Sequence, residues 1–240
     1  MSNPIYAVTY PRQGSIVSTH DPIVFLFDVD NTLIDNDRFS ADLRARLERD
    51  FGAEGRTRYE AIDKDIRSQV GYADYLGALQ RLRGQASSPE FMGMSFFLLD
   101  YPFDERRFPG VLEAIAHLRT IGRPVIMSDG DTVFQPRKIR RAGLWDAFQG
   151  DVLIYVHKED MLDDMRRRYP ADHYVMVDDK PRILVALKKL LGDKVTTVFV
   201  KQGHYAAAAG KELEETPPDI TIDTVAELAT MRREDFLAAA

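Results

Sequence analysis

The sequence predicts an α/β protein whose doubly wound, mostly parallel sheet is interrupted by an inserted all-helical domain. Short apolar runs rich in β-branched and aromatic side chains alternate with amphipathic helical patterns along most of the chain, which is typical of βαβ units. One long stretch lacks such runs and repeats its apolar residues at helical spacing instead. We therefore assign residues 1–35 and 108–240 to an α/β core and residues 36–107 to a helical insert.

The first strand is expected at residues 23–29, where "IVFLFDV" has the apolar character of a strand covered on both faces. Comparable runs follow downstream: "PVIMS" at 124–128, "DVLIYV" at 151–156, "HYVMV" at 173–177, "KVTTVFV" at 194–200 and the weaker "DITI" at 219–222. Because these runs are largely continuous rather than alternating, they favour parallel pairing with helices on both faces of the sheet.

Helices are expected between the strands, because apolar residues recur there at three- and four-residue spacing. The segments with this pattern are 111–118, 133–142, 159–169 and 181–191. A glycine follows three of them, at Gly122, Gly143 and Gly192, and glycine is the residue that most often closes a helix.

The insert has its own helical pattern. Apolar residues recur about every four positions over 38–51, 59–70 and 72–82, so three or more amphipathic helices are expected there. The segment "GQASSPEFMG" at 84–93 interrupts the pattern. We interpret the apolar stretch "FMGMSFFLL" at 91–99 as the part of the insert that packs on the core, although a seam over a substrate would have the same composition.

Bulk composition narrows the class of protein. A chain of 240 residues that is 45% hydrophobic can bury a full core, and a net charge of -6 provides no basic field for nucleic acid. With no cysteine there are no disulfides or thiolate sites. No signal-peptide pattern is present, and no apolar run approaches the ~18 residues of a membrane span. We expect a cytoplasmic protein without nucleic-acid or membrane partners, and an irregular arm over residues 1–22.

Acidic and other polar side chains gather where the expected strands end. Asp28 and Asp30 follow the first strand, Ser128 and Asp129 the second, Lys158 the third, and Asp178 with Asp179 the fourth. Ligands of open α/β sheets bind outside the carboxyl ends of the strands, so we expect these residues to converge on one site. Crowded carboxylates cost free energy unless a cation or a substrate offsets their repulsion.

Such a set of side chains suits phosphoryl transfer. Oxygen ligands are those that Mg²⁺ prefers, and the ion shields a carboxylate nucleophile from the substrate phosphate. One aspartate can attack phosphorus while a second, two residues on, reaches the leaving group from the following loop. The Ser128 hydroxyl and the Lys158 ammonium group would hold the transferring oxygens.

These motifs, in this order, resemble those of the haloacid dehalogenase (HAD) superfamily of hydrolases. "DVDNT" at 28–32 matches D-x-D-x-T, and a serine, a lysine and "VDDKP" at 177–181 follow at the ends of later strands. The similarity covers about residues 23–200, and the insert directly after the first motif resembles the helical cap of the family's first cap class. The resemblance implies a Rossmann-like core.

The resemblance also implies a role for each matching residue. It makes Asp28 the nucleophile and a metal ligand, and Asp30 the general acid and base, whose backbone carbonyl also faces the metal. The remaining implied roles are loop support and substrate contact for Thr32, phosphate contact for Ser128 and its neighbour Asp129, a charge clamp for Lys158, and metal binding for Asp178 and Asp179, with Asp179 favoured as the direct ligand. Two positions depart from the family pattern, since Ile183 replaces a further acid and Asn31 stands where glycine is frequent.

The residues and the resemblance together predict a Mg²⁺-dependent phosphatase that hydrolyses a small phosphorylated metabolite through an aspartyl-phosphate on Asp28. A phosphomutase acting on a sugar phosphate would keep every core motif and stays open as an alternative. A haloacid dehalogenase is disfavoured, because a departing halide needs no proton and those members lack the second aspartate. A metabolite-binding module without activity would not need a proton-transfer residue such as Asp30 beside a nucleophile.

Other polar residues have simpler interpretations. Asp129 and Asp131 are better explained as turn and helix-cap residues than as metal ligands. The basic run "PRKIRRAG" at 136–143 is interpreted as a helix face rather than a nucleic-acid patch. The segment "AAAAGKELEETPPD" at 206–219 is expected to be a loosely held connection. The sequence contains no signal for the oligomeric state or for the choice of substrate.

Overall fold

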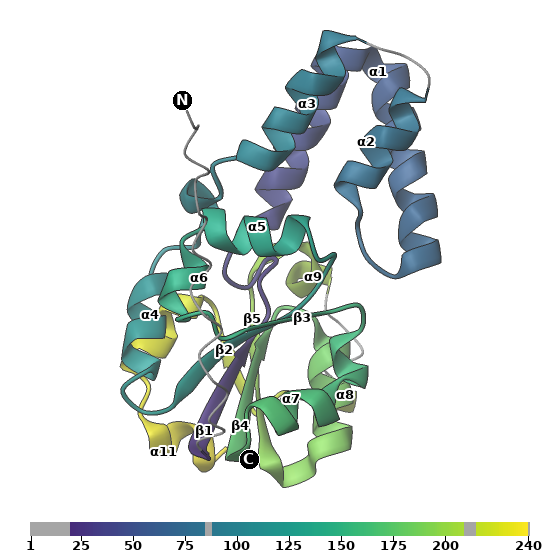
Figure 1. Cartoon of the computed structure of the whole chain (residues 1–240). Coiled ribbons are helices and arrows are strands. Elements are labelled where there is room, and N and C mark those ends of the chain that lie inside the picture. The colour runs from purple at the N-terminus through teal and green to yellow at the C-terminus, as the bar shows by residue number, and fades with distance from the viewer. Residues whose placement is uncertain (1–19, 85–87, 209–214, 240) are drawn as a thin grey trace, which may run out of the picture.

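The sheet forms the centre of the molecule, with a helical lobe above its upper edge (Figure 1). The computed structural model describes residues 20–84, 88–208 and 215–239. Over these residues six strands form one sheet in the order β3-β2-β1-β4-β5-β6, with every neighbouring pair parallel. The strands are β1 Asp21–Phe27, β2 Arg123–Asp129, β3 Val152–Tyr155, β4 Ala171–Asp178, β5 Val195–Val200 and β6 Ile220–Ile222. The prediction of a doubly wound parallel sheet is confirmed.

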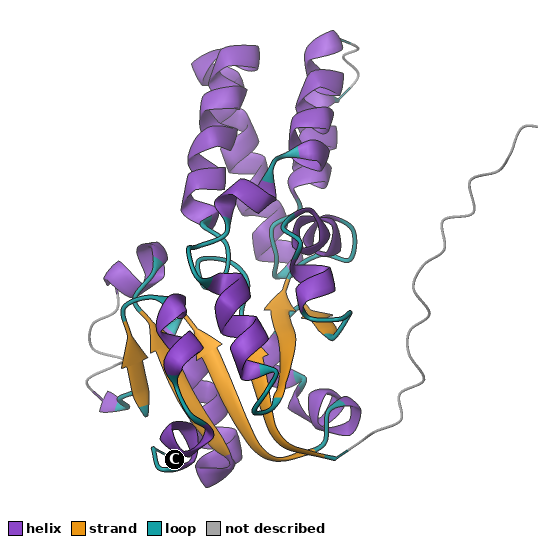
Figure 2. Cartoon of the chain, turned by 90° about the vertical axis from the view of Figure 1, so that its left-hand side faces the viewer, coloured by secondary structure: helices purple, strands orange, loops and turns teal. Residues whose placement is uncertain are grey.

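Helices cover both faces of the sheet, as Figures 1 and 2 show. One face packs against α4 Val111–Leu118, α6 Leu144–Ala147, the 3₁₀ helix η4 Val225–Thr230 and α11 Arg233–Leu237. The other face packs against α7 Leu162–Arg168 and α8 Pro181–Leu191. Strands β1, β2, β4 and β5 therefore have apolar side chains buried on both sides, which is why their sequences read as largely continuous apolar runs.

Shorter elements connect these layers. They are α5 Phe134–Arg141, α9 Gly203–Ala208, and the 3₁₀ helices η1 Phe103–Arg106, η2 Lys158–Asp160 and η3 Gly192–Lys194. The predicted arm over residues 1–22 lies mostly outside the described residues. Its last part is regular rather than irregular, because β1 begins at Asp21 and pairs there with Ala171 of β4. The predicted loose connection at 206–219 is described only in part, and residues 206–208 belong to α9.

The helical lobe consists of α1 Asn36–Val70, α2 Tyr75–Arg83 and α3 Pro89–Asp100. Although α1 is one span, Gly52 within it has a φ of 70°, outside the helical range. Ion pairs join Arg44 to Glu60 at 3.5 Å and Glu48 to Arg56 at 3.6 Å. A straight helix rises about 1.5 Å per residue and would hold the first pair far apart. The chain therefore folds back at Gly52 into two antiparallel arms, which correspond to the predicted segments 38–51 and 59–70.

The expected interruption at 84–93 is wrong in its second half. Helix α3 begins at Pro89, because proline is well suited to the first turn of a helix, where its missing N–H is not needed. The placement of the domain boundaries at residues 36 and 107 stays a prediction. Among the described helices, none is both long and apolar enough to cross a lipid bilayer.

An aromatic cluster joins the helical lobe to the core. Phe134 of α5 lies 5.0 Å from Tyr75 of α2 and 5.9 Å from Phe39 of α1, measured between ring centroids. Phe103 contacts Phe39 at 5.0 Å, and Tyr101 contacts it at 4.9 Å. Because these rings are buried and arranged edge-on or tilted, the lobe packs on α5 through specific aromatic contacts.

Candidate active site

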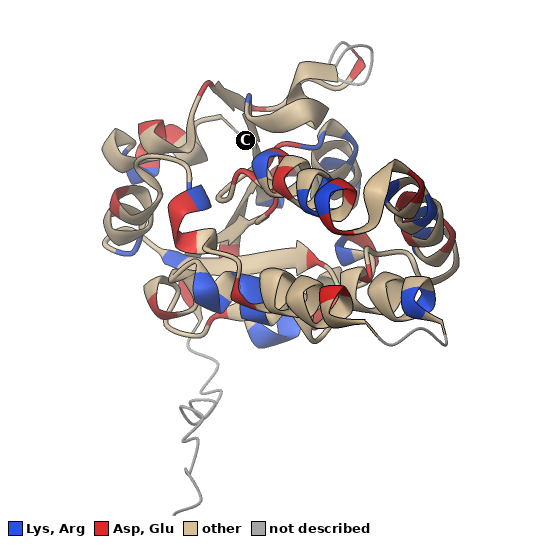
Figure 3. Ribbon diagram, turned by 90° about the horizontal axis from the view of Figure 1, so that it is seen from above, with Lys and Arg blue, Asp and Glu red and all other residues tan. Residues whose placement is uncertain are grey.

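The sheet register brings the predicted site residues together at the carboxyl ends of four neighbouring strands, β3, β2, β1 and β4. Strand β1 lies between β2 and β4, and the backbone N–H of Asp28 donates to the carbonyl of Val177 at 3.0 Å. The strands β2 and β3 are added on one side of β1, and β4 to β6 are added on its other side. Open α/β folds bind ligands at such a switch point in the strand order. Viewed from above, acidic and basic positions lie close together around this end of the sheet (Figure 3).

Asp28 is buried between two lysines. Its Oδ1 accepts a hydrogen bond from Lys158 Nζ at 2.6 Å, and its Oδ2 accepts one from Lys180 Nζ at 3.0 Å. Burial alone would raise the pKa of Asp28, but the two ammonium groups outweigh it and lower that pKa to about 2. The Asp28 carboxylate is therefore ionised throughout the physiological pH range.

Lys158 also binds a second aspartate. Its Nζ donates to Asp178 Oδ2 at 2.6 Å, and its side chain is fully buried. Burial would lower the pKa of Lys158, but the charges of Asp178 and Asp28 raise it, so the amine stays protonated. Two of its three N–H donors are used by carboxylates, which leaves one for another oxygen.

Asp179 is the unsatisfied member of the acid cluster. Its side chain is completely buried, and neither carboxylate oxygen has a hydrogen-bond partner. The nearest cation, Lys180 Nζ, is 3.5 Å from Oδ1. Burial raises the pKa of Asp179 to about 8, and the charges of Asp178 and Asp28 add to the effect against the opposing Lys180. A buried carboxylate without donors requires a cation or a proton.

A divalent metal ion fits this cluster. Oxygens of Asp28, Asp178 and Asp179 lie within 4.8 Å of one another, and carboxylate oxygens are hard ligands of the kind that Mg²⁺ prefers. Asp178 is already bonded to Lys158 and to the backbone N–H of Lys180 at 2.9 Å. The two unpartnered oxygens of Asp179 therefore support the expectation that Asp179 is the more direct ligand.

The two departures from the family pattern have structural explanations. Ile183 lies on the buried face of α8 among apolar side chains, and the cluster takes its third carboxylate from Asp178 instead. Asn31 has a φ of 65°, a left-handed conformation that suits glycine and that asparagine tolerates. Its Oδ1 also accepts backbone hydrogen bonds from Asn36 at 3.0 Å and Asp37 at 3.1 Å, which fixes the loop.

Ser128 and Asp129 lie beside the acid cluster at the end of β2. The Ser128 hydroxyl is buried and accepts a hydrogen bond from Gln135 Nε2 at 3.0 Å. The Asp129 carboxylate accepts the backbone N–H of Lys158 at 2.7 Å, and burial raises its pKa to about 6 against the charge of Lys158. Asp131 caps the start of α5 through the N–H groups of Val133 and Phe134, as interpreted from the sequence. Contact of Ser128 and Asp129 with substrate stays a prediction.

Thr32 and Asp30 lie in the loop that leads to the helical lobe. Thr32 is fully buried, its Oγ1 has no hydrogen-bond partner, and its carbonyl accepts Gln202 Nε2 at 3.2 Å. The Asp30 carboxylate is not part of the three-acid cluster, since it pairs with Lys138 of α5. Metal contact through the Asp30 backbone carbonyl stays a prediction.

The sequence analysis missed Lys138. It lies in the basic run at 136–143, which was interpreted as a helix face rather than a nucleic-acid patch, and its side chain is only 1% exposed. Lys138 is buried because Phe134, one turn earlier, and Ile139 place this side of α5 against the interior. The four-residue spacing between Phe134 and Lys138 was the feature of the sequence that could have predicted the burial of Lys138. The arginines Arg137 and Arg141 instead donate to backbone carbonyls at the end of α3.

Lys180 was also missed, although it lies inside the "VDDKP" motif. Besides its contacts with Asp28 and Asp179, its ammonium group lies 5.5 Å from the ring centroid of Tyr205 in α9. His204, the preceding residue, binds Asp37 at the start of α1 through Nδ1 at 2.5 Å. Helix α9 thus contributes side chains to the margin of the site.

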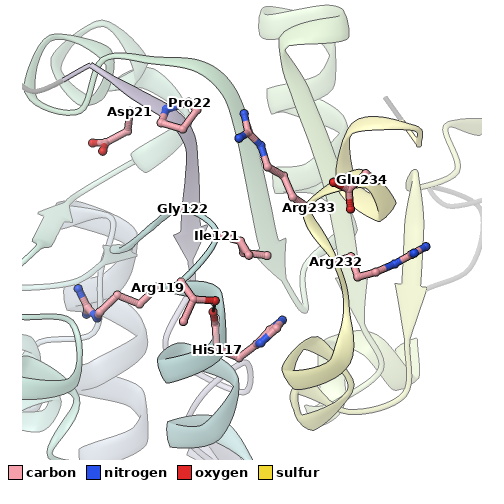
Figure 4. A pocket seen from close by; sticks show the side chains of 10 residues that line it. Asp21, Pro22, His117, Arg119, Ile121, Gly122, Arg232, Arg233 and Glu234 are labelled. Atoms are coloured by element: carbon pink, nitrogen blue, oxygen red, sulfur yellow. Dashed lines mark hydrogen bonds between the residues drawn. The ribbon is translucent and has the colours of Figure 1, made fainter.

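A pocket of about 630 Å³ lies near the opposite end of the sheet (Figure 4). His117, Arg119, Arg232 and Arg233 line it, but Arg119 and Arg232 point away from each other in Figure 4. Arg119 donates to the carbonyl of Ala147, and Arg232 pairs with Asp235 at 3.2 Å. Because these cations do not converge on one point, the acid cluster is the stronger candidate for a catalytic site.

Comparisons with known proteins agree with this choice. The family model for haloacid dehalogenase-like hydrolases matches residues 24–200. A haloacid dehalogenase-like hydrolase from Burkholderia xenovorans is 54% identical, with 90% of this chain and 99% of that chain covered and a TM-score of 0.82. No significant match is found among functionally curated proteins.

Two more distant structures share the fold. L-2-haloacid dehalogenase from Xanthobacter autotrophicus is 17% identical, with 86% of this chain and 96% of that chain covered and a TM-score of 0.54. A HAD hydrolase from Bacillus subtilis, solved bound to magnesium, is 15% identical, with 85% of this chain and 96% of that chain covered and a TM-score of 0.55.

Proposed function

The chain belongs to the haloacid dehalogenase-like hydrolases, and we propose that within this family it is a Mg²⁺-dependent phosphatase. Its substrate is a small phosphorylated metabolite, which it hydrolyses through an aspartyl-phosphate on Asp28. The observation that carries the proposal is the buried cluster of Asp28, Asp178 and Asp179, in which both oxygens of Asp179 have no hydrogen-bond partner. Such a cluster is completed by a cation and by an anionic substrate that the cation attracts.

Asp28 begins the reaction as the nucleophile. Its low pKa, about 2, keeps the carboxylate ionised, and one oxygen forms a bond to phosphorus while the bond from phosphorus to the leaving oxygen breaks. Asp30 must carry a proton when this step begins, and it gives that proton to the leaving oxygen, so the alcohol departs neutral. In the second step Asp30 accepts a proton from water, the water oxygen bonds to phosphorus, and the bond between phosphorus and Asp28 breaks.

The remaining residues bind and orient the phosphoryl group. Lys158 has one N–H donor beyond those that bind Asp28 and Asp178, and it directs this donor to a phosphoryl oxygen. The Ser128 hydroxyl, held by Gln135, donates to another oxygen. Asp28, Asp178 and Asp179 would hold Mg²⁺, which would neutralise charge between the nucleophile and the substrate. The helical lobe closes the site from water during the first step.

Phosphoryl transfer is favoured over carbon–halogen cleavage by Asp30. A halide departs without a proton, whereas an alkoxide leaving group needs one, and Asp30 lies in the loop two residues after Asp28. The likeness to L-2-haloacid dehalogenase, at 17% identity, concerns the fold alone. A phosphomutase would use the same core residues, and it differs in passing the phosphoryl group to a sugar hydroxyl rather than to water.

Hydrolysis of p-nitrophenyl phosphate, with and without Mg²⁺, tests the proposal. The purified protein is expected to release p-nitrophenol only with the metal, and Asp28→Asn is expected to lose this activity. Release that persists in Asp28→Asn would contradict the proposed nucleophile. Halide release from 2-haloacids with no phosphatase activity would instead assign a dehalogenase, and transfer between sugar hydroxyls without net phosphate release would assign a mutase.

A further inference from the structure

Lys138 is a buried lysine that no step of the proposed reaction uses directly. It lies on α5, a helix of the core, and its side chain is 1% exposed. Its Nζ forms an ion pair with Asp30 Oδ1 and donates to Asn36 Oδ1 at 2.6 Å. The same ammonium group lies 5.7 Å from the ring centroid of Phe39 and 5.4 Å from that of Phe103.

This burial is expensive for a purely structural contact. Removing an ammonium group from water costs several kcal/mol, and Lys138 offsets the cost only through Asp30, Asn36 and the faces of two rings. A methionine of similar length would fill the same space among the aromatic side chains without that cost. Buried ion pairs are often no more stabilising than apolar replacements, so the contact with Asp30 requires another explanation.

Two side chains on one face of helix α5 contact two of the proposed catalytic residues. Gln135 and Lys138 are three residues apart, which places them on the same side of a helix, and both are buried. Gln135 Nε2 donates to the Ser128 hydroxyl at 3.0 Å, whereas Lys138 binds the Asp30 carboxylate. Ser128 is at the end of β2 and Asp30 in the loop after β1, so α5 ties both strand ends to one rigid element.

We propose that Lys138 is a positioning residue that holds the Asp30 carboxyl group where it can serve the leaving-group oxygen. This inference rests on the proposed phosphatase function. In the first step the bond from Asp28 to phosphorus forms, the bond to the leaving oxygen breaks, and the Asp30 proton moves to that oxygen. Without Lys138, Asp30 would turn freely in its 29% exposed position, and correct alignment for proton transfer would become infrequent.

The effect of losing Lys138 depends on the leaving group. p-Nitrophenolate departs readily without a proton, whereas the alkoxide of 2-phenylethyl phosphate does not. We expect Lys138→Met to lower kcat for 2-phenylethyl phosphate by at least about tenfold more than kcat for p-nitrophenyl phosphate, since general acid catalysis contributes about 10²- to 10⁴-fold. KM is expected to change little, because Lys138 is not placed at the phosphoryl group.

Gln135→Leu is the matched control. It changes the same face of α5 but releases Ser128 rather than Asp30, so it is expected to lower the rates for both substrates by the same factor. Equal losses for the two substrates in Lys138→Met would overturn the inference and leave Lys138 with a structural role. Where Lys138→Met does not fold by circular dichroism, Asn36→Ala, which removes the other partner of Nζ, must show the same preference, and equal losses there would overturn the inference too.

The outcome also separates this inference from the proposed function. A wild-type protein without phosphatase activity on either substrate contradicts the function itself. A wild-type protein that needs Mg²⁺ and Asp28, combined with equal losses in Lys138→Met, contradicts only the role of Lys138.

Discussion

The two ends of the sheet differ in how their charged side chains are paired. At the amino end, Arg123 of β2 binds both oxygens of Asp151 at 2.9 Å, contacts Asp21 at 3.4 Å and lies 4.8 Å from the ring centroid of Tyr169. At the carboxyl end, Asp179 is more deeply buried, and neither of its oxygens accepts a hydrogen bond. One set of charges is satisfied by the fold alone, and the other is not.

The Arg123–Asp151 contact is what we expect of a structural ion pair, whereas the environment of Asp179 is what we expect of a ligand-binding site. A bidentate pair fixes its own geometry and needs nothing from outside. A buried carboxylate whose oxygens accept no hydrogen bond lowers the stability of the fold until a proton or a metal ion satisfies it. Under the proposed function, the carboxyl end is less stable than it could be because it is built to bind ligands, as is expected at catalytic sites.

The largest expected effect follows from removing the unpartnered charge. Asp179→Asn is expected to lower Mg²⁺-dependent turnover by about 100-fold or more, because a metal ligand is lost. At pH 8–9 and without metal, it is expected to stabilise the protein by about 1–3 kcal/mol, which for a chain of this length raises Tm by about 2–4 °C per kcal/mol. Phosphate release and thermal melts measure the two effects.

The sign of this stabilisation depends on pH. The pKa of Asp179 in the folded protein is about 8, above the ordinary value of 3.8. The contribution of the Asp179 carboxyl group to the stability of the folded protein is therefore fully present below pH 3.8 and is lost as the pH rises through 8. The advantage of Asp179→Asn is expected at pH 8–9 and should vanish near pH 4. An advantage that is independent of pH would contradict the assignment of the raised pKa to Asp179.

A second effect concerns the pH dependence of metal binding. Because Asp179 must lose its proton to bind Mg²⁺, the apparent Kd is expected to fall by about tenfold per unit between pH 6 and pH 8 and to level off above. Isothermal titration calorimetry in buffers of different ionisation enthalpy would detect the released proton. The same Kd at pH 6 and pH 8 would show that Asp179 does not bind the metal.

A smaller effect is expected from Lys180. Its ammonium group lies 3.0 Å from Asp28 Oδ2 and 3.5 Å from Asp179 Oδ1, so it repels a cation that enters the cluster. Lys180→Met is expected to tighten Mg²⁺ binding by about 3- to 10-fold. Lys201→Met is the matched control, since Lys201 follows β5 and pairs with the exposed Asp223 instead. Weaker Mg²⁺ binding in Lys180→Met would show that Lys180 supports the site.

The smallest effect should come from the amino end of the sheet. Asp151→Asn weakens the paired contact with Arg123 and is expected to destabilise the protein by about 1 kcal/mol, given the partial exposure of both side chains. Turnover should not change, because this end is remote from the acid cluster. Asp151→Asn and Asp179→Asn are thus expected to shift Tm in opposite directions at pH 8–9, and shifts of the same sign would remove the contrast between the two ends.

Local sequence patterns determined much of the protein. Apolar runs located the strands within a few residues, because burial on both faces of a parallel sheet demands continuous apolar side chains. Motifs at the strand ends identified Asp28, Asp178 and Asp179, because residues that end parallel strands meet at one edge whatever the details of packing. Helical spacing likewise indicated the two arms of α1.

Only the tertiary structure decided which charges pair. Lys138 and Asp30 are 108 residues apart, and although the spacing from Phe134 could indicate that Lys138 is buried, nothing local identifies Asp30 as its partner. The structure also decided that Asp178 is bonded to Lys158 while Asp179 is left without donors. The periodicity of apolar residues indicates which face of a helix or strand is buried. The partner of a buried charge depends instead on how distant elements pack, and no short window of sequence contains that information.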